Sequence, residues 1–556
     1  MNMVHSPILK VEGLTVDFLS DQDPVRAVDN VSFQIERGET LVILGESGSG
    51  KSVSTSVVMD LVDRPPGHIV AGNIVFEGTD LGRLDAEARR SINGRQIAMI
   101  FQDPLAYLNP VYTVGRQIGE VFESHGSMPG AQIRERTIDL LRRVGIPDPE
   151  RRVDHYPHQF SGGQRQRVMI AMAIALKPDL LIADEPTTAL DVSVQAQILD
   201  LLRDLQRETR MALILITHDR EVAAAMADRV VVMNRGQVVE TGPARDVFSN
   251  PQHAYTKRLI SALPHGSAVE TSHRRSRDAA GGTILKVEQL TKEYALPSGI
   301  FGKPRTFRAV SDVSFDVGRG ETLGIVGESG SGKSSIARML LRLAEPTSGR
   351  ALYRGDDVFA MHARELLKFR RKVQMVFQDP YGSMNPRMNI RSIISEPWAI
   401  HRDILPKPEW RDRVAELLEL VGLSPDHAER YPHQFSGGQR QRIAIARALA
   451  SEPELVICDE AVSALDVSIQ MQVIDLLADL RSRLGLSYIF ITHDLPIVRH
   501  FADRILVMKQ GEVVEEGSTT AIFDNPRHDY TRSLLAATPR PKWIACEEKD
   551  LARDGS

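Results

Sequence analysis

The chain is poor in cysteine and in long apolar runs, and each scarcity excludes a class of protein. Its two cysteines, Cys458 and Cys546, are too few for a disulfide framework or a four-cysteine metal site. The longest apolar candidate, 169–183, is interrupted by charged residues and a proline, and no stretch reaches the ~18–20 residues that cross a bilayer. Residues 1–10 lack the charged-then-apolar pattern of a signal peptide. If a membrane is involved, we expect another chain to cross it.

The overall composition is that of a soluble globular protein. Hydrophobic residues make up 42% and charged residues 25% of the 556 residues, a length that predicts two to four domains. The formal net charge of -5 argues against a broad electrostatic grip on nucleic acid. Cys458 lies within an apolar run and is predicted to be a core residue.

The sequence is written twice. The segment YPHQFSGGQRQR begins at Tyr156 and again at Tyr431, and GESGSGKS begins at Gly45 and again at Gly327. Further pairs follow in the same order with nearly constant spacing: FQDP with FQDP, LLIADEP with LVICDEA, ILITHD with IFITHD, and NPQHAYT with NPRHDYT. Such a register indicates duplication. We predict two domains, 1–265 and 284–541, joined by a flexible linker, 266–283, that is rich in Gly, Ser, Arg and Ala, and followed by a polar tail, 542–556.

Each copy contains a phosphate-binding loop. The first follows an apolar run, 40–44, and precedes a stretch, 52–62, that is compatible with a helix. Glycines let backbone N–H groups turn toward phosphate oxygens, lysine reaches the terminal phosphates, and the serine hydroxyl is a ligand for Mg²⁺. The predicted residues are Gly45, Ser47, Gly48, Gly50, Lys51 and Ser52 in the first copy, and Gly327, Ser329, Gly330, Gly332, Lys333 and Ser334 in the second.

Polar side chains follow three further apolar strands of each copy. Asp184 is predicted to hold Mg²⁺ or its water, and Glu185 to polarise the attacking water as general base. His218 is expected to contact the γ-phosphate, and the amide of Gln102 to ligate Mg²⁺. The alternatives are charged strand ends and polar caps, but the recurrence beside a phosphate-binding loop favours function. The second copy supplies Asp459, Glu460, His493 and Gln378.

A second glycine-rich element precedes an apolar run, 168–176, that is predicted to be a helix. It reads Ser-Gly-Gly-Gln in both copies and is either an anion-binding turn or an ordinary turn with a serine cap. Two copies allow its use in trans. The residues are Ser161, Gly162, Gly163 and Gln164, and Ser436, Gly437, Gly438 and Gln439.

The order of these motifs resembles the ATP-binding-cassette (ABC) family over nearly the whole chain, twice. The resemblance implies two α/β P-loop domains, each with a mostly parallel core sheet, an antiparallel β region and a helical subdomain. It also implies that the cassettes pair head to tail within the chain, so that ATP and Mg²⁺ bound at Lys51 face Ser436, and those bound at Lys333 face Ser161. Phe18 and Tyr294 match the family's adenine-stacking position, with core aromatics as the alternative. Asp191 and Asp466 match a family position at the seam between the cassettes.

The repeated Asn-Pro-x-His-x-Tyr-Thr after each cassette, at Asn250 and Asn525, resembles the oligopeptide, dipeptide and nickel importer group. This implies an ATPase on the cytoplasmic face of the bacterial inner membrane, working with two permease subunits and a periplasmic or lipid-anchored substrate-binding protein, without nucleic acid. Peptides, glutathione, opines, oligosaccharides and nickel stay open as cargo, because the cargo is not expected to touch this chain. The rival interpretation is a soluble tandem ATPase acting on ribosomes or DNA.

One segment differs between the copies. Pro186-Thr187-Thr188 is replaced by Ala461-Val462-Ser463 directly after the two acids. Because both acids are retained, we expect both sites to hydrolyse ATP, the second more slowly. The retained acids also argue against a sensor that does not hydrolyse nucleotide.

Overall fold

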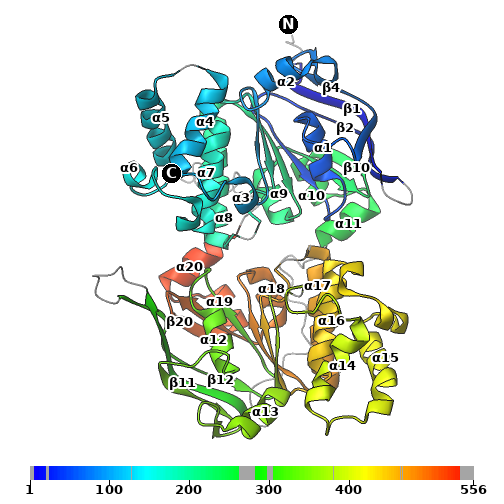
Figure 1. Cartoon of the computed structure of the whole chain (residues 1–556), viewed down its shortest axis with the longest axis vertical. Coiled ribbons are helices and arrows are strands. Elements are labelled where there is room, and N and C mark those ends of the chain that lie inside the picture. The colour runs from blue at the N-terminus through cyan, green and yellow to red at the C-terminus, as the bar shows by residue number, and fades with distance from the viewer. Residues whose placement is uncertain are drawn as a thin grey trace, which may run out of the picture. The chain divides into compact units, whose positions relative to one another are not determined.

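The computed structural model describes residues 6–19, 24–126, 128–188, 190–261, 282–296, 305–379, 381–463, 465 and 467–538. Within these ranges the chain forms two compact units, one before residue 262 and one from 282 to 537 (Figure 1). Most of the predicted linker, the predicted tail with Cys546, and Asp466 lie outside the described residues.

The first unit contains two sheets. An antiparallel sheet has the order β2-β1-β4-β5, and a six-stranded sheet has the order β10-β9-β3-β8-β7-β6, in which only β10 is antiparallel to its neighbour. The strands are β1 (Leu9–Phe18), β2 (Val25–Ile35), β3 (Thr40–Leu44), β4 (Gly67–Phe76), β5 (Thr79–Asp80), β6 (Ile97–Ile100), β7 (Leu180–Asp184), β8 (Ala212–Thr217), β9 (Arg229–Asn234) and β10 (Gln237–Pro243).

Helices cover both faces of this core sheet. Alternate residues of β3 enter two different cores: Leu41 and Ile43 pack with the antiparallel sheet and α1, whereas Val42 and Leu44 pack with α4, α5, α7 and α8. Figure 1 shows α4 and α5 grouped together, away from β1 and β2. The helices are α1 (Lys51–Val58), α2 (Ala86–Ile92), α3 (Pro104–Tyr107), α4 (Val114–His125), α5 (Gly130–Arg143), α6 (Pro149–Arg152), α7 (Gly162–Ile174), α8 (Val192–Thr209), α9 (Arg220–Met226), α10 (Ala244–Ser249) and α11 (Ala254–Ser261).

The second unit repeats this topology. Its sheets have the orders β12-β11-β14-β15 and β16-β17-β18-β13-β19-β20. Its elements are β11 (Thr283–Leu296), β12 (Arg305–Gly318), β13 (Thr322–Val326), α12 (Lys333–Leu340), β14 (Ser348–Tyr353), β15 (Asp356–Asp357), α13 (Ala363–Lys372), β16 (Val373–Val376), α14 (Ile390–Ile400), α15 (Trp410–Leu420), α16 (Gly437–Leu449), β17 (Leu455–Asp459), α17 (Val467–Leu484), β18 (Ser487–Ile491), α18 (Leu495–Phe501), β19 (Arg504–Lys509), β20 (Glu512–Ser518), α19 (Thr519–Asp524) and α20 (Asp529–Ala536). The predicted fold class, with its mostly parallel core, antiparallel region and helical subdomain, is confirmed in both units.

The core strands bring the predicted motifs to one edge of the sheet. Strands β3, β7 and β8 are buried along their whole length, which explains their unbroken apolar sequences. Because β3 pairs with β8, and β8 with β7, all in parallel, their carboxyl ends meet. The phosphate-binding loop follows β3, His218 follows β8 and Asp184 is the last residue of β7, so all three lie at the position where parallel sheets bind ligands.

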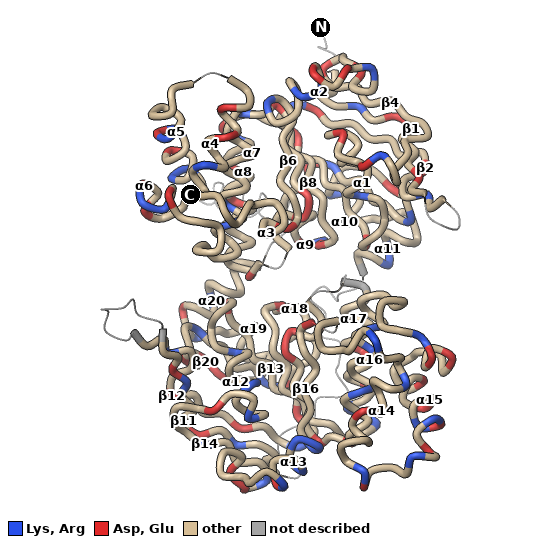
Figure 2. Tube along the Cα trace, viewed as in Figure 1, with Lys and Arg blue, Asp and Glu red and all other residues tan. Residues whose placement is uncertain are grey.

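Two helix boundaries differ from the sequence prediction, and the predicted core position of Cys458 is confirmed. Helix α1 ends at Val58 rather than at residue 62, and α7 begins at Gly162, six residues earlier than predicted. Val414, Leu417 and Leu418 of α15 are buried together on one face, and Cys458 is buried in the core, which raises the pKa of its thiol to about 12. Acidic and basic residues are interspersed along the traces of both units (Figure 2). Within the described ranges, each helix is too short or too polar to span a membrane.

Candidate active site

The phosphate-binding loop of the first unit curls around its lysine. Gly50 takes a φ of 92° and lies so close to the strand β2 region that a Cβ there would lie 2.5 Å from the carbonyl oxygen of Ala27. Lys51 is 4% exposed, and its ammonium donates to the carbonyl oxygens of Gly45 and Glu46, both at 2.8 Å. A positive charge is therefore held inside a loop of backbone groups at the start of α1, an arrangement that suits phosphate.

The second unit reproduces this loop. Gly332 takes a φ of 99°, and Lys333 donates to the carbonyl oxygens of Gly327 and Glu328 at 2.6 and 2.7 Å. Gly48 and Gly330, which turn the two loops, have φ values of 74° and 76°.

A serine hydroxyl and a buried carboxylate meet beside each lysine. Ser52 donates to Asp184 at 3.0 Å, and Ser334 donates to Asp459 at 2.9 Å. Burial raises the pKa of Asp184 to about 6, and burial also raises the pKa of Asp459. Such a carboxylate gains from a nearby cation, and hydroxyl and carboxylate oxygens are ligands that Mg²⁺ accepts.

The next acid is held by three side chains. The carboxylate of Glu185 accepts hydrogen bonds from the amide of Gln102 at 2.8 Å and from the hydroxyl of Thr188 at 2.9 Å, and lies 3.0 Å from His218 Nδ1. Burial alone would raise its pKa, but His218, Thr188 and Lys51 outweigh burial and lower the pKa below its ordinary value. Glu185 also has a φ of 45°, which turns the chain sharply at the strand end. An ionised, oriented carboxylate of this kind can accept a proton from water.

The matching acid of the second unit is held differently. Gln378 donates to the carboxylate of Glu460 at 2.8 Å, but His493 Nδ1 lies 3.5 Å away. The hydroxyl of Ser463, at the position of Thr188, donates to the backbone carbonyl of Glu460 at 3.0 Å. The hydrogen bond from His493 is the main cause that lowers the pKa of Glu460 against burial. The two carboxylates therefore share their charge state but differ in the groups that hold them.

The Ser-Gly-Gly-Gln residues form the first turn of α7 and of α16. Ser161 caps α7, since its hydroxyl accepts the N–H of Gln164 at 3.3 Å while the Gln164 side chain accepts the N–H of Ser161 at 3.2 Å. A Cβ at Gly163 would lie 2.4 Å from Val194, so α7 and α8 approach closely there. Ser436 and Gly438 repeat the cap and the close approach, the latter against Ile469. These residues lie on the helical subdomain rather than among the strand ends.

The two candidate adenine-stacking residues differ in their surroundings. Phe18 ends β1 and packs partly buried against the core that contains α1. Tyr294 in β11 is 39% exposed, with the Lys292 ammonium 5.0 Å from its ring centre. Their role stays a prediction.

Two kinds of site residue were missed from the sequence. One is Thr188, for which the only signal in the sequence was that the second copy has Ser463 at the matching position. The other is a pair of tyrosines, Tyr255 and Tyr530, whose hydroxyls accept the backbone N–H groups of Glu46 and Glu328 in the phosphate-binding loops, both at 3.2 Å. Both tyrosines belong to the repeated C-terminal motif, whose recurrence was the signal available.

Family models match both halves of the chain. The ABC transporter model matches residues 28–188 and 310–463, more than half of the chain. The model of the oligopeptide/dipeptide transporter C-terminal region matches residues 239–284 and 514–550.

Curated relatives match over nearly the full length. The glutathione import ATP-binding protein GsiA of Escherichia coli (strain K12) is 46% identical over 96% of this chain and 89% of its own length. The peptidoglycan transport ATP-binding protein YejF of Agrobacterium fabrum is 46% identical over 96% of each chain. A solved dimeric ATP-binding cassette in a post-hydrolysis state with ADP and phosphate is 29% identical over 43% of this chain and 99% of its own, with a TM-score of 0.39. The chain belongs to the ABC transporter family, as a tandem-cassette ATPase that carries the oligopeptide/dipeptide transporter C-terminal region in both halves.

Proposed function

We propose that this ATPase powers an importer for peptides or related small solutes at the cytoplasmic face of a bacterial inner membrane. The observation that carries the proposal is the duplicated match to the oligopeptide/dipeptide transporter C-terminal region, beside two cassettes that both retain the catalytic acid. The partners are two permease subunits and a periplasmic or lipid-anchored substrate-binding protein. The names of the relatives, which import glutathione or transport peptidoglycan, support this class of cargo.

Each nucleotide site is proposed to combine residues of both copies. Lys51, Ser52, Gln102 and Asp184 bind ATP and Mg²⁺ of one site, which Ser436, Gly437 and Gly438 complete. The other site pairs Lys333, Ser334, Gln378 and Asp459 with Ser161, Gly162 and Gly163. Support comes from the retention of all these residues in both copies. The side chains of Gln164 and Gln439 accept the backbone N–H groups of Ser161 and Ser436, and so fix the Ser-Gly-Gly-Gln turns that begin α7 and α16.

Hydrolysis follows from the groups that surround each acid. Mg²⁺, when bound by the hydroxyl, carboxylate and amide oxygens, offsets the charge of the phosphates. Glu185 accepts a proton from the attacking water, His218 orients Glu185 and the water, and Lys51 stabilises charge on the terminal phosphate. Glu460, His493 and Lys333 act alike in the second site. The amide N–H of Gln102 is donated to Glu185. Because the helical subdomain follows Gln102 along the chain, Gln102 also links this subdomain to Glu185.

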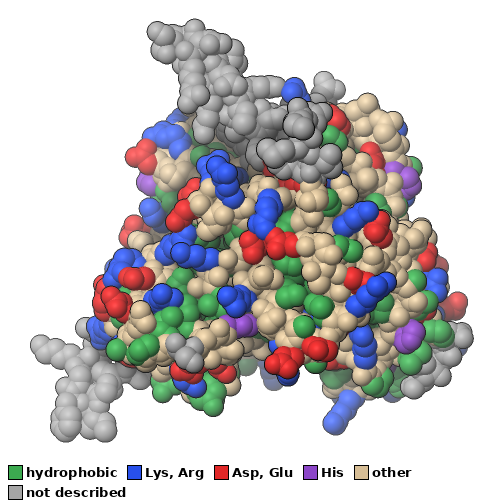
Figure 3. Space-filling model, turned by 90° about the horizontal axis from the view of Figure 1, so that it is seen from above, with side chains coloured by type: hydrophobic (Ala, Val, Ile, Leu, Met, Phe, Trp, Pro, Cys, Tyr) green, Lys and Arg blue, Asp and Glu red, His purple; other side chains and the backbone are tan. Residues whose placement is uncertain are grey.

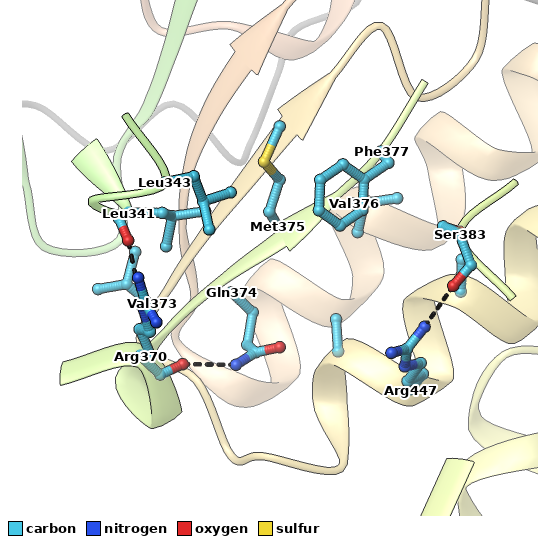
Figure 4. A pocket seen from close by; sticks show the side chains of 12 residues that line it. Leu341, Leu343, Arg370, Val373, Gln374, Met375, Val376, Phe377, Ser383 and Arg447 are labelled. Carbon is cyan, nitrogen blue, oxygen red and sulfur yellow. Dashed lines mark hydrogen bonds between the residues drawn. The ribbon is translucent and has the colours of Figure 1, made fainter. Parts of the chain in front are cut away.

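An apolar hollow of the second cassette suits a partner helix. It is lined by Leu341 and Leu343 after α12, by Met375 to Phe377 at the end of β16, and by Arg447 of α16 (Figure 4). Phe377 is 43% exposed. It directly precedes Gln378, which donates to the Glu460 carboxylate, so a side chain bound in the hollow would lie next to the Gln378 backbone. We propose that a cytoplasmic helix of one permease subunit binds this hollow.

The first cassette differs at this place. Phe101, the counterpart of Phe377, stacks on Tyr107 with ring centres 3.9 Å apart and planes at 8°. The counterpart of Tyr107 in the second cassette is Ser383, which leaves Phe377 without that ring. The two cassettes therefore present different surfaces, which suits two permease subunits that differ in sequence.

The rival function on ribosomes or DNA has less support. Lysine and arginine side chains are mixed with acidic ones on the face in Figure 3, rather than collected into a basic surface. The experiment that tests the proposal is purification of the tagged chain from gently solubilised membranes of its host. Two permease subunits and a substrate-binding protein are expected to co-purify. Recovery of ribosomes or nucleic acid with no membrane protein would contradict the importer function. The assignment of ATPase activity would still hold in that case.

A further inference from the structure

The repeated C-terminal motif has an internal structure that explains its residues. The carboxylate of Glu240 in β10 accepts the backbone N–H groups of Gln252 and His253 at 2.8 and 3.0 Å. The ring nitrogen Nδ1 of His253 then accepts the N–H of Tyr255 at 3.2 Å, which caps the start of α11. These contacts fix where α11 begins and therefore where the tyrosine lies.

The tyrosine hydroxyl contacts the peptide group that also holds the lysine of the phosphate-binding loop. Tyr255 is 6% exposed, and its hydroxyl accepts the N–H of Glu46. The carbonyl of the same Gly45–Glu46 peptide group accepts the Lys51 ammonium at 2.8 Å. Because the N–H and C=O of a trans peptide point in opposite directions, fixing the N–H toward Tyr255 fixes the C=O toward Lys51.

The second cassette repeats the chain of contacts. Glu515 accepts the N–H groups of Arg527 and His528 at 2.7 and 3.1 Å, and His528 Nδ1 accepts the N–H of Tyr530 at 3.1 Å. Tyr530 is 8% exposed and accepts the N–H of Glu328, while the Gly327 carbonyl accepts Lys333. The same geometry in two copies of different sequence indicates a retained role.

We propose that Tyr255 and Tyr530 are positioning residues for nucleotide binding, through which the C-terminal extension of each cassette sets the position of the lysine in its own phosphate-binding loop. The inference rests on the proposed nucleotide sites. Without the hydroxyl, the Glu46 N–H loses this acceptor, and the Gly45 carbonyl, one of the two carbonyls that accept from Lys51, is held less firmly toward the lysine. One neutral hydrogen bond corresponds to about a 2- to 10-fold change in an equilibrium constant, so ATP affinity should fall by about that factor.

The test uses the full chain with Tyr255→Phe, in a Lys333→Ala background that leaves one binding site. We expect the Kd of a fluorescent ATP analogue and the KM for ATP to rise about 2- to 10-fold, with kcat changed less than about 2-fold. Tyr530→Phe in a Lys51→Ala background should behave alike. Glu240→Gln, which weakens the anchor of α11, should shift the Kd in the same direction.

The matched control is Tyr353→Phe in the background used for Tyr530→Phe. Tyr353, the last residue of β14, is also buried, and its hydroxyl donates to the Glu454 carboxylate at 3.1 Å. Its loss should leave ATP affinity unchanged. An unchanged Kd in Tyr255→Phe and Tyr530→Phe, or a fall in kcat alone, overturns the inference. ATP binding that survives the Lys51→Ala/Lys333→Ala pair instead overturns the proposed nucleotide sites.

Discussion

Replacing Thr188 by valine should slow the first site and make it resemble the second. Valine keeps the shape of threonine and removes the hydroxyl that donates to the Glu185 carboxylate at 2.9 Å. Gln102 and His218 would remain, and their counterparts Gln378 and His493 are the two groups that lie against the Glu460 carboxylate in the second cassette. A hydrogen bond to a charged group contributes about 1.5–3 kcal/mol. If about half of that orients the base in the transition state, kcat falls about 3- to 10-fold.

The assay is steady-state ATP hydrolysis in a Glu460→Gln background, so that turnover reports Glu185. The hydroxyl of Thr188 helps to lower the pKa of Glu185, and its loss raises that pKa. Because the base must be ionised, the acidic limb of the pH–rate profile should then move to higher pH. Thr188→Ser, which keeps the hydroxyl, should restore most of the rate.

The neighbouring residue provides the matched control. Thr187 is buried, and the second cassette has Val462 in its place, so Thr187→Val should leave kcat nearly unchanged. Grafting Pro-Thr-Thr in place of Ala461-Val462-Ser463 should raise turnover at Glu460. A normal kcat and an unmoved acidic limb in Thr188→Val would refute the reasoning.

Two further predictions concern the buried acid and the apolar hollow. Burial raises the pKa of Asp184 from 3.8 to about 6, so the folded state binds the extra proton and loses stability as pH rises from about 4 to about 6. Asp184→Asn should therefore stabilise the nucleotide-free protein by about 2–3 kcal/mol near pH 8 and by little below pH 4. The variant should show a higher Tm than the wild type near pH 8 and the same Tm below pH 4. A variant whose Tm equals that of the wild type at both pH values would contradict this prediction. Ser383→Tyr, which copies Tyr107 of the first cassette, should fill the hollow beside Phe377 and weaken recovery of one permease subunit, whereas unchanged recovery would exclude the hollow as its binding site.

Much of the fold could be predicted because the core strands are buried on both faces. Apolar runs such as 40–44 and 212–216 match β3 and β8 almost residue for residue, since nothing polar interrupts them. Helix ends were harder to predict. Helix α1 stops at Val58, and Asp60 then takes a φ of 56°, although no glycine or proline marks the place.

Other features depend on contacts that the sequence does not display. Gly162 and Gly163 lie in the first turn of α7 although glycine has a low helix propensity, and Val194 leaves no room for a Cβ at Gly163. The role of Tyr255 depends on Glu46, which lies 209 residues away along the chain. Thr188 and Ser463 occupy matching positions, but Thr188 donates to the carboxylate of Glu185 and Ser463 to the backbone carbonyl of Glu460.

The central claim is that two ATP-hydrolysing cassettes power import. Its most direct test reconstitutes the chain with its co-purified permease subunits and substrate-binding protein in vesicles and measures uptake of the bound solute with ATP on the cassette side. We expect uptake with the wild-type chain and none with Glu185→Gln/Glu460→Gln, although the latter still binds ATP. Uptake that continues in the double variant, or that needs no ATP, would contradict the account.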